Sequence, residues 1–310
     1  MTGIKRRGGR RRGLMVQERD LVLLSQLWIM HVADREQLMV TAGFTSITRI
    51  NTRLLALVRA GILRRFFIGC DGGRKALYAL SAKGAQLIGM PRRGPRRSQD
   101  EFLVADFSVL HQLAINNVYC NLRFGKIPIP HVQFVNWIAF TETITADLPL
   151  IPDGYVEFMT PSGIDSSFIE VDLGHEALSV WEKKAAHYKQ LAMSGDFARR
   201  FKQSRFRVLV LVNSARRARA IRAAVAAVTE KLFWFAMLDE VSGDKFFSPV
   251  WLIASGVSIR SRAFLQRSWT PPSLKSSSSA LMAAIAGASP FSRNPSNGPN
   301  SAQINSRRSA

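Results

Sequence analysis

The first third of the chain alternates apolar stripes of helical period with short strand-like runs. Leucines recur on one helix face between Leu21 and Leu27. The sequence Asp34-Arg-Glu-Gln37 resembles a capping box and predicts the start of a second, short helix. Thr45 or Ser46 is placed to cap a third helix, and Gly61 is placed to end it. Three helices are therefore predicted before residue 62.

Two apolar runs, residues 62–68 and 75–80, flank the turn Asp71-Gly72-Gly73 and predict a β-hairpin. Three helices and a hairpin make a winged helix-turn-helix, which we assign to residues 17–89. The second helix of such a pair enters the major groove of DNA. Polar residues off the apolar stripe of this helix are therefore candidate DNA contacts, namely Arg49, Asn51, Thr52 and Arg53. Basic residues of the hairpin are candidate phosphate contacts, namely Arg64, Arg65, Arg74 and Lys75. The alternatives are ordinary solvated positions, or a winged domain that docks onto protein.

A linker rich in Pro, Gly and Arg, residues 90–100, separates this domain from a second one, residues 101–258. The second domain begins with a long helix to about Phe124, in which His111 is expected to be a hydrogen-bonded core residue. Further elements are predicted in the order strand, strand, strand, helix, strand, helix, strand. They cover residues 132–141, 154–159, 167–173, 176–192, 207–212, 215–235 and 250–254. The fold class is α+β, with the winged domain followed by an α/β domain.

Three acids mark the candidate chemistry of the second domain. Asp153 opens one predicted strand, and Glu170 and Asp172 lie two apart on the next, so both point to the same face. Unpaired carboxylates at short range repel each other and raise each other's pKa. A divalent metal such as Mg²⁺ or Mn²⁺ relieves this repulsion by binding them. Lys184 interrupts the apolar stripe of the following helix, so it either extends to solvent or reaches a buried acid. The alternative for Pro152-Asp153-Gly154 is a common turn, and for the paired acids a solvated strand edge.

These residues, Pro152-Asp153 and Glu170-Val171-Asp172, resemble the core of the PD-(D/E)xK nuclease superfamily. That superfamily usually has Lys two positions after the Glu, where this chain has Asp172, and Lys184 is then the candidate replacement. The pattern Glu170-x-Asp172-x-Gly174, followed by Lys184-x-x-x-Tyr188, is similar to the replication-relaxation family of plasmids and other mobile elements. The similarity extends from about Gln17 to about Ser258.

The resemblance implies a role in plasmid or mobile-element replication and DNA relaxation. If the second domain is active, it implies nicking of DNA with Asp153, Glu170 and Lys184 as the catalytic residues. Asp153, Glu170 and Asp172 would then hold Mg²⁺ or Mn²⁺, and otherwise no cofactor is expected. The alternative is a non-enzymatic DNA-binding accessory or transcription-type regulator with an inactive nuclease-like domain, which the missing Lys favours. A protein that binds RNA or an acidic partner is a further alternative.

Charge supports a polyanionic partner. The 310 residues carry a formal net charge of +21, and the sequence pI is near 11.2. Residues 1–16 form a basic arm in which Arg10, Arg11 and Arg12 are candidate phosphate contacts. The expected partners are double-stranded DNA, plasmid replication or mobilisation proteins, and a second copy in a homodimer.

No apolar run approaches the roughly 20 residues of a spanning helix, and the two cysteines lack metal-ligand spacing. We therefore expect no membrane partner, and a cytoplasmic protein with reduced thiols. Residues 265–310 are rich in Ser, Asn and Pro and are expected to be a disordered tail.

Overall fold

A computed structural model describes residues 14–70, 73–93, 102–103 and 107–258 of the chain. The chain divides into two compact units, Met1–Pro271 and Pro272–Ala310, and all the described residues lie in the first. Most of the predicted basic arm, including Arg10, Arg11 and Arg12, lies outside the described residues. So do most of the predicted linker and the whole predicted tail.

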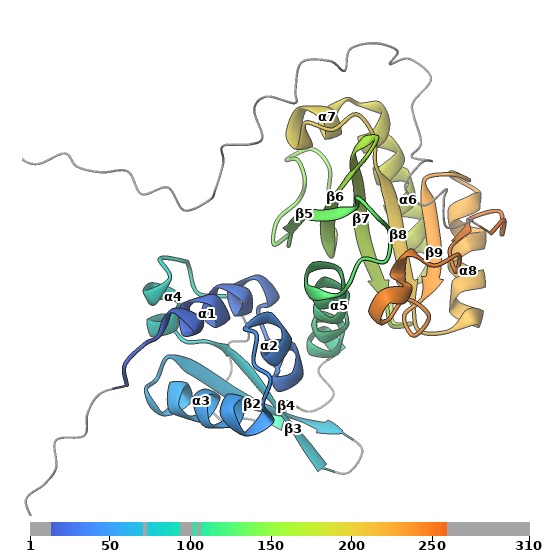
Figure 1. Cartoon of the computed structure of the whole chain (residues 1–310). Helices are drawn as coiled ribbons and strands as arrows, with labels where there is room; N and C mark the ends of the chain where they lie inside the picture. Colours follow the sequence, from blue (N-terminus) through green and yellow to red (C-terminus); the bar gives the residue numbers. More distant parts are fainter. Residues whose placement is uncertain (1–13, 71–72, 94–101, 104–106, 259–310) are drawn as a thin grey trace, which may run out of the picture. The chain divides into compact units, whose positions relative to one another are not determined.

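Four helices and a small sheet, all within residues 14–103, form the N-terminal half of the fold (Figure 1). The predicted helices are confirmed as α1 (Glu18–Met30), α2 (Arg35–Thr41) and α3 (Ile47–Arg59). The predicted hairpin is confirmed as β2 (Leu63–Cys70) and β3 (Gly73–Leu80), followed by α4 (Ala82–Leu87). The short strands β1 (Ala33–Asp34) and β4 (Phe102–Leu103) complete a sheet of order β1-β3-β2-β4.

Local sequence signals place the ends of these helices. Asp34 Oδ1 accepts the Gln37 amide at 2.8 Å, and Gln37 Oε1 accepts the Asp34 amide at 3.2 Å, so the predicted capping box is formed. Ser46, rather than Thr45, caps α3 by accepting the Arg49 amide. Gly61 follows α3 with φ +69°, a conformation that glycine adopts without strain.

A six-stranded sheet of order β10-β9-β8-β7-β6-β5 forms the C-terminal half of the described chain. In chain order its first three strands are β5 (Gln133–Ile138), β6 (Gly154–Thr160) and β7 (Gly163–Asp172). Each is antiparallel to the next. Strand β8 (Arg207–Val212) pairs in parallel with β7, and β9 (Phe233–Met237) pairs in parallel with β8. The edge strand β10 (Leu252–Ile253) is antiparallel to β9. The helices are α5 (Phe107–Phe124), α6 (Leu178–Met193), α7 (Asp196–Phe201) and α8 (Ala215–Ala226), with a short 3₁₀ helix at Gly243–Phe247.

Two predictions for this half were wrong. The helix expected to continue from residue 215 to Phe235 ends at Ala226, and Phe233–Met237 is a strand instead. The run Phe-Trp-Phe-Ala-Met is apolar and aromatic, which suits a strand that pairs in parallel with β8 inside the sheet. The long helix expected from residue 101 begins at Phe107, because Phe102–Leu103 pairs with β2.

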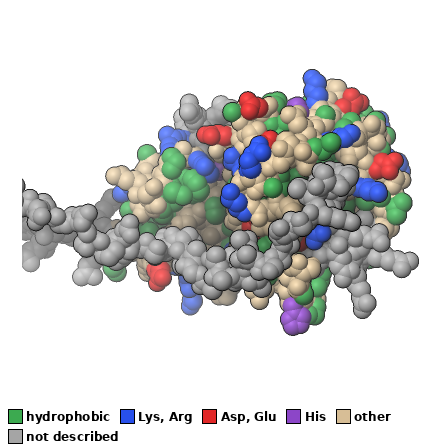
Figure 2. Space-filling view, turned by 90° about the horizontal axis from the view of Figure 1, so that it is seen from above, with side chains coloured by type: hydrophobic (Ala, Val, Ile, Leu, Met, Phe, Trp, Pro, Cys, Tyr) green, Lys and Arg blue, Asp and Glu red, His purple; other side chains and the backbone are tan. Residues whose placement is uncertain are grey.

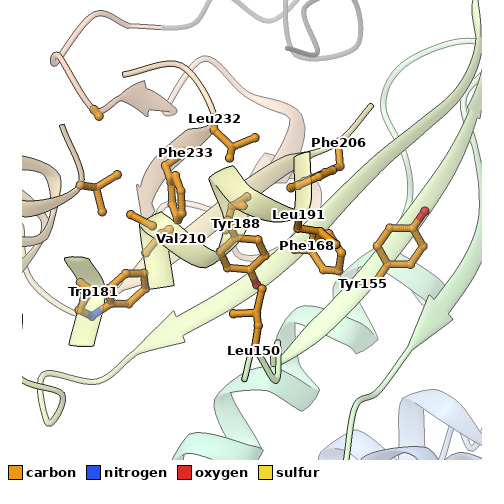
Figure 3. Packing of buried hydrophobic residues seen from close by; sticks show 14 of the residues in the cluster. Leu150, Tyr155, Phe168, Trp181, Tyr188, Leu191, Phe206, Val210, Leu232 and Phe233 are labelled. Atoms are coloured by element: carbon orange, nitrogen blue, oxygen red, sulfur yellow. The ribbon is translucent and has the colours of Figure 1, made fainter. Parts of the chain in front are cut away.

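Both faces of the larger sheet are covered. Residues of α5 and of the 243–251 segment pack with Val156, Ile169 and Leu209 on one face. Helices α6, α7 and α8 pack with Phe168, Val208 and Val210 on the other. Figure 3 shows part of this second core, in which Phe168 lies between Tyr155 and Tyr188. Alternate residues of β7 therefore enter different cores, as the two-residue period of a strand requires.

Helix α5 also contacts the N-terminal half. The side-chain nitrogen of Asn116, Nδ2, donates to the Val32 carbonyl at 2.6 Å, and Gln37 Nε2 donates to the Leu113 carbonyl at 2.9 Å. Tyr119 and the free, buried thiol of Cys120 belong to the core of the first three helices. Among the described residues, no helix combines the length and the apolar character that crossing a lipid bilayer requires.

Phe168→Ala should destabilise the protein by about 3–5 kcal/mol, because it opens a cavity in a core that cannot collapse fully. Phe168 is fully buried and its ring contacts those of Tyr155, Tyr188 and Phe206. Urea unfolding measures the change, with Met193→Ala at a side chain that is 65% exposed as the control. Similar losses in the two variants would contradict this account of the core.

Candidate functional site

The hairpin of β6 and β7 brings the predicted acids to one end of the larger sheet. The register pairs Gly154 with Ile169, so Asp153, just before β6, lies beside the stretch of β7 that carries Glu170. A side chain at position 154 would collide with the Trp137 ring, since a Cβ there would lie 2.5 Å from it. Glycine at this position therefore lets β6 begin tightly against β5, and this fixes the place of Asp153.

Glu170 is fully buried and is held by two side chains of α6. Its Oε2 accepts a hydrogen bond from Lys184 Nζ at 2.9 Å, and its Oε1 accepts one from the Tyr188 hydroxyl. Burial raises the pKa of Glu170 and the charge of Asp153 adds to this, while Lys184 and Tyr188 oppose it, giving a pKa of about 7. Of the two alternatives for Lys184, extending to solvent or reaching a buried acid, the second is confirmed.

Lys184 bridges two acids. Its ammonium also donates to both oxygens of Glu176 at 3.0 Å, and it lies 4.8 Å from the centre of the Trp181 ring. Burial lowers the pKa of Lys184, but the charges of Glu170, Glu176 and Asp153 outweigh it and the pKa lies above its ordinary value. Lys184 therefore stays charged and balances the carboxylates around it.

Asp153 contacts His111, which the sequence predicted to be a hydrogen-bonded core residue. Its Oδ2 accepts the Val171 amide at 2.7 Å and lies 3.3 Å from His111 Nε2. His111 Nε2 also lies 2.8 Å from the Val171 carbonyl oxygen. Burial lowers the pKa of His111, but the Asp153 carboxylate and the Val171 carbonyl together raise it to about 9. The imidazole is therefore a cation at neutral pH, and it lies between Asp153 and the Val171 carbonyl.

Asp172 has the expected orientation and a different partner. Like Glu170, it contacts α6, since Trp181 Nε1 donates to its Oδ2 at 2.9 Å. Arg217 of α8 forms a two-bond pair with it, with both N–O distances at 2.8 Å, and the Gly174 amide donates to Oδ1. Burial raises the pKa of Asp172, but these hydrogen bonds outweigh it and the pKa lies below its ordinary value. Both oxygens of Asp172 are occupied by donors, which argues against it as a metal ligand.

The donor set limits what metal site these residues could form. Within the described part of the chain, no group of three or more His, Cys, Asp or Glu side chains is arranged to hold a metal ion. Asp153 and Glu170 are the remaining hard oxygen ligands, but both oxygens of Glu170 already accept hydrogen bonds, from Lys184 and Tyr188, so a metal here would have to displace one of these donors. Two carboxylates can suffice for Mg²⁺ or Mn²⁺, because Mg²⁺ commonly binds one or two carboxylates and keeps several waters, so Asp153 and Glu170 fit such an ion once a Glu170 oxygen is released.

Three residues of this cluster escaped the sequence analysis as site residues: His111, Glu176 and Arg217. His111 and Glu176 come from separate segments of the chain, and neither has a spacing that signals a partner. Arg217 belongs to a run of arginines that resembles an ordinary solvated helix start. The need for Arg217 became apparent only in the structure, where Asp172 is buried and requires a cation.

The predicted DNA-contact residues of α3 divide into two groups. Arg49, Asn51 and Thr52 are exposed, as expected for positions off the apolar stripe. Arg53 is only 18% exposed and forms an ion pair with the buried Asp20 of α1, where its Nε donates to Oδ1 at 2.7 Å. Its Nη2 also donates to the Met15 carbonyl at 2.8 Å. Arg53 therefore fastens α3 to α1, because a buried carboxylate requires a partner.

The hairpin carries its basic residues beside aromatic rings. The guanidinium groups of Arg65 and Arg74 lie 5.1 Å and 6.0 Å from the centre of the Phe67 ring, and that of Arg64 lies 4.8 Å from Phe66. Lys75 Nζ lies 2.6 Å from Asp34 Oδ2, so this lysine also links the hairpin to the start of α2. On the face of the molecule in Figure 2, basic and acidic side chains are interspersed.

The pKa of His111 should fall in Asp153→Asn, because the carboxylate contributes most to raising it. A histidine whose pKa is raised on folding adds stability below its unfolded pKa of about 6.5, and loses it as the pH rises through 9. The advantage of the wild type over His111→Gln in urea unfolding should therefore shrink between pH 6.5 and 9. NMR titration of the imidazole measures the pKa, with Asp147→Asn, at an exposed acid, as the control. A His111 pKa that is the same in Asp153→Asn and in the wild type would show that the two groups do not interact.

The comparisons with known proteins bear on this cluster. The family model for replication-relaxation matches residues 24–203, which is more than half of the 310 residues. No curated protein and no solved structure matches the chain significantly. The matched segment contains Asp153, Glu170 and Lys184, and it ends before β8 and α8. The chain therefore belongs to the replication-relaxation family, and this membership indicates a role in the replication and relaxation of mobile elements.

Proposed function

We propose that this member of the replication-relaxation family binds double-stranded DNA through α3 and the β2–β3 hairpin. The observation that carries the proposal is the exposed polar face of α3, where Arg49, Asn51 and Thr52 project from a helix fastened by Arg53. An Arg binds guanine edges or phosphates, and an Asn binds adenine. The formal net charge of +21 supports a polyanionic partner for the whole chain.

The order of elements supports a winged helix-turn-helix for this half. Helices α2 and α3 follow each other closely, the hairpin comes next, and β1 pairs with β3 beside the helices. In a winged domain α3 would enter the major groove and the hairpin would lie along the phosphates. Arg65 and Arg74, held around Phe67, would then be the phosphate contacts of the hairpin.

A second proposed activity is metal-assisted nicking of DNA at the Asp153–Glu170 cluster. The observation that favours it is that three separate segments bring these residues together. Lys184 lies 2.9 Å from Glu170, and Asp153, just before β6, lies beside the stretch of β7 that carries Glu170. Asp153 and Glu170 would hold Mg²⁺ or Mn²⁺, which when bound activates water and polarises a phosphate. Lys184 already lies against Glu170 and would stabilise negative charge that develops on the phosphate.

The same cluster also fits a non-enzymatic accessory protein. Glu170 is fully buried, and the cation His111 already lies between Asp153 and the Val171 carbonyl. A nuclease-like half without activity would then serve as a scaffold beside the DNA-binding half. Metal binding and cleavage separate these two functions.

Asn51→Ala should reduce discrimination between DNA sequences by about 1–3 kcal/mol at one base pair, because a side chain that reads a base edge is removed. The preferred sequence is first selected from a randomised duplex pool. Fluorescence anisotropy then compares that duplex with single-base variants, using the exposed Gln190→Ala on α6 as the control. An equal loss on every duplex would exclude a base-reading role for Asn51.

Titration calorimetry with Mn²⁺ should show binding at millimolar or tighter affinity in the wild type and none in Asp153→Ala, because one of the two carboxylate ligands is removed. Asp147→Ala, at an exposed acid, is the control and should bind as the wild type does. Wild-type protein that fails to bind Mn²⁺ would leave a purely structural ion-pair cluster.

Incubation with supercoiled plasmid and Mg²⁺ or Mn²⁺, followed by gel separation of topological forms, completes this test. Nicking by the wild type that disappears in Asp153→Ala supports the enzyme. Metal binding without nicking places the protein with the non-enzymatic accessories.

A further inference from the structure

A basic groove lies between the start of α1 and one flank of α3. It has a volume of about 380 Å³ and is lined by eight residues, among them Arg19, Arg49 and Arg53. Asn51 is exposed on the same helix and does not line it. The polar residues of α3 therefore face in two directions, which the pattern of the sequence alone did not reveal.

The charges in the groove are only partly balanced. Arg53 is paired with Asp20, whereas the structure records no acidic partner for Arg19 or Arg49 among the described residues. None of the described residues that line the groove is itself acidic. Two guanidinium groups in one concave surface repel each other, so an anion that enters the groove gains energy from both.

The remaining lining suits a sugar–phosphate unit. Thr48 and Thr52 are exposed on α3 and bring hydroxyl groups that can donate to phosphate oxygens. Phe44 provides an apolar surface, and the Arg19 guanidinium lies 5.0 Å from the centre of its ring. A ring stacked with Arg19 holds that side chain at the groove and offers an apolar contact for a deoxyribose.

We infer that this groove holds a backbone phosphate of the DNA duplex next to the stretch that α3 reads. Arg19 and Arg49 bind the phosphate, and Arg53 is a positioning residue that holds α3 against α1. The inference rests on the proposed DNA binding and assigns Arg49 to the backbone and Asn51 to the bases. An anionic occupant suits the groove better than a basic segment, because its lining contains three arginines and like charges repel.

The test uses the full chain and the double variant Arg19→Gln/Arg49→Gln. Both side chains are exposed, so the substitutions leave the core intact. The matched control is Arg200→Gln/Lys202→Gln, which removes the same charge from two exposed positions at α7. Fluorescence anisotropy measures affinity for several duplexes of equal length and different sequence over a range of salt concentrations.

The groove variant should bind every duplex about tenfold more weakly, and the slope of log affinity against log salt should fall by about 0.9 for each phosphate that is no longer neutralised. The control should stay within about twofold of the wild type, since neither of its residues lies on α3 or lines the groove. A groove variant that binds like the control overturns the inference and leaves the proposed DNA binding intact.

Two further outcomes would also overturn it. A loss confined to particular sequences would show that Arg19 and Arg49 read bases instead of phosphate. If wild-type protein binds no duplex, the proposed function fails, and titration of inorganic phosphate then shows whether the groove takes a free anion in place of DNA.

Discussion

Strand β7 buries three carboxylates, and each is paired with a cation from a different element. Asp165 lies 2.8 Å from Arg207 of β8, Glu170 lies 2.9 Å from Lys184 of α6, and Asp172 lies 2.8 Å from Arg217 of α8. Removing one partner of such a pair costs about 3–5 kcal/mol, because it leaves an uncompensated charge in the interior. The elements around β7 therefore have little freedom to shift, since each must keep a cation on this strand.

This constraint also organises the candidate site. The ion pairs Glu170–Lys184 and Asp172–Arg217 are linked by Glu176. Its side chain accepts a hydrogen bond from Lys184, and its backbone carbonyl accepts one from Arg217. Helices α6 and α8 are thereby held at the same end of the sheet, where Asp153 and His111 lie beside the Val171 backbone. Any chemistry at this end would use groups whose positions are fixed before a substrate arrives, which is the condition for electrostatic stabilisation of developing charge.

A buried acid paired with a distant cation also fastens the helices of the N-terminal half. Asp20 is buried near the start of α1, and Arg53 of α3 compensates it. A residue expected to read DNA is instead needed to hold the helix that carries its neighbours, so Arg49 and Asn51 keep a defined orientation. The proposed DNA contacts of this half would then depend for their precision on an ion pair that does not itself touch DNA.

Much of this protein was determined by the sequence itself. The helical period located α1, cap residues placed the starts of α2 and α3, and alternation on a strand put Glu170 and Asp172 on one face. The interruption of an apolar stripe singled out Lys184, which the stripe left either extended to solvent or paired with a buried acid, and the structure shows the pair. These features depend on neighbours within a few residues, which a linear pattern records.

The tertiary structure alone decided the long-range pairs. It assigned Arg217 to Asp172, Asp20 to Arg53 and His111 to Asp153, and it made Phe233–Met237 a strand beside β8. A period in the sequence fixes which face of an element is apolar, but it does not say which two faces meet. A buried charge requires a partner wherever one can reach it, so the identity of that partner follows only from the packing of distant elements.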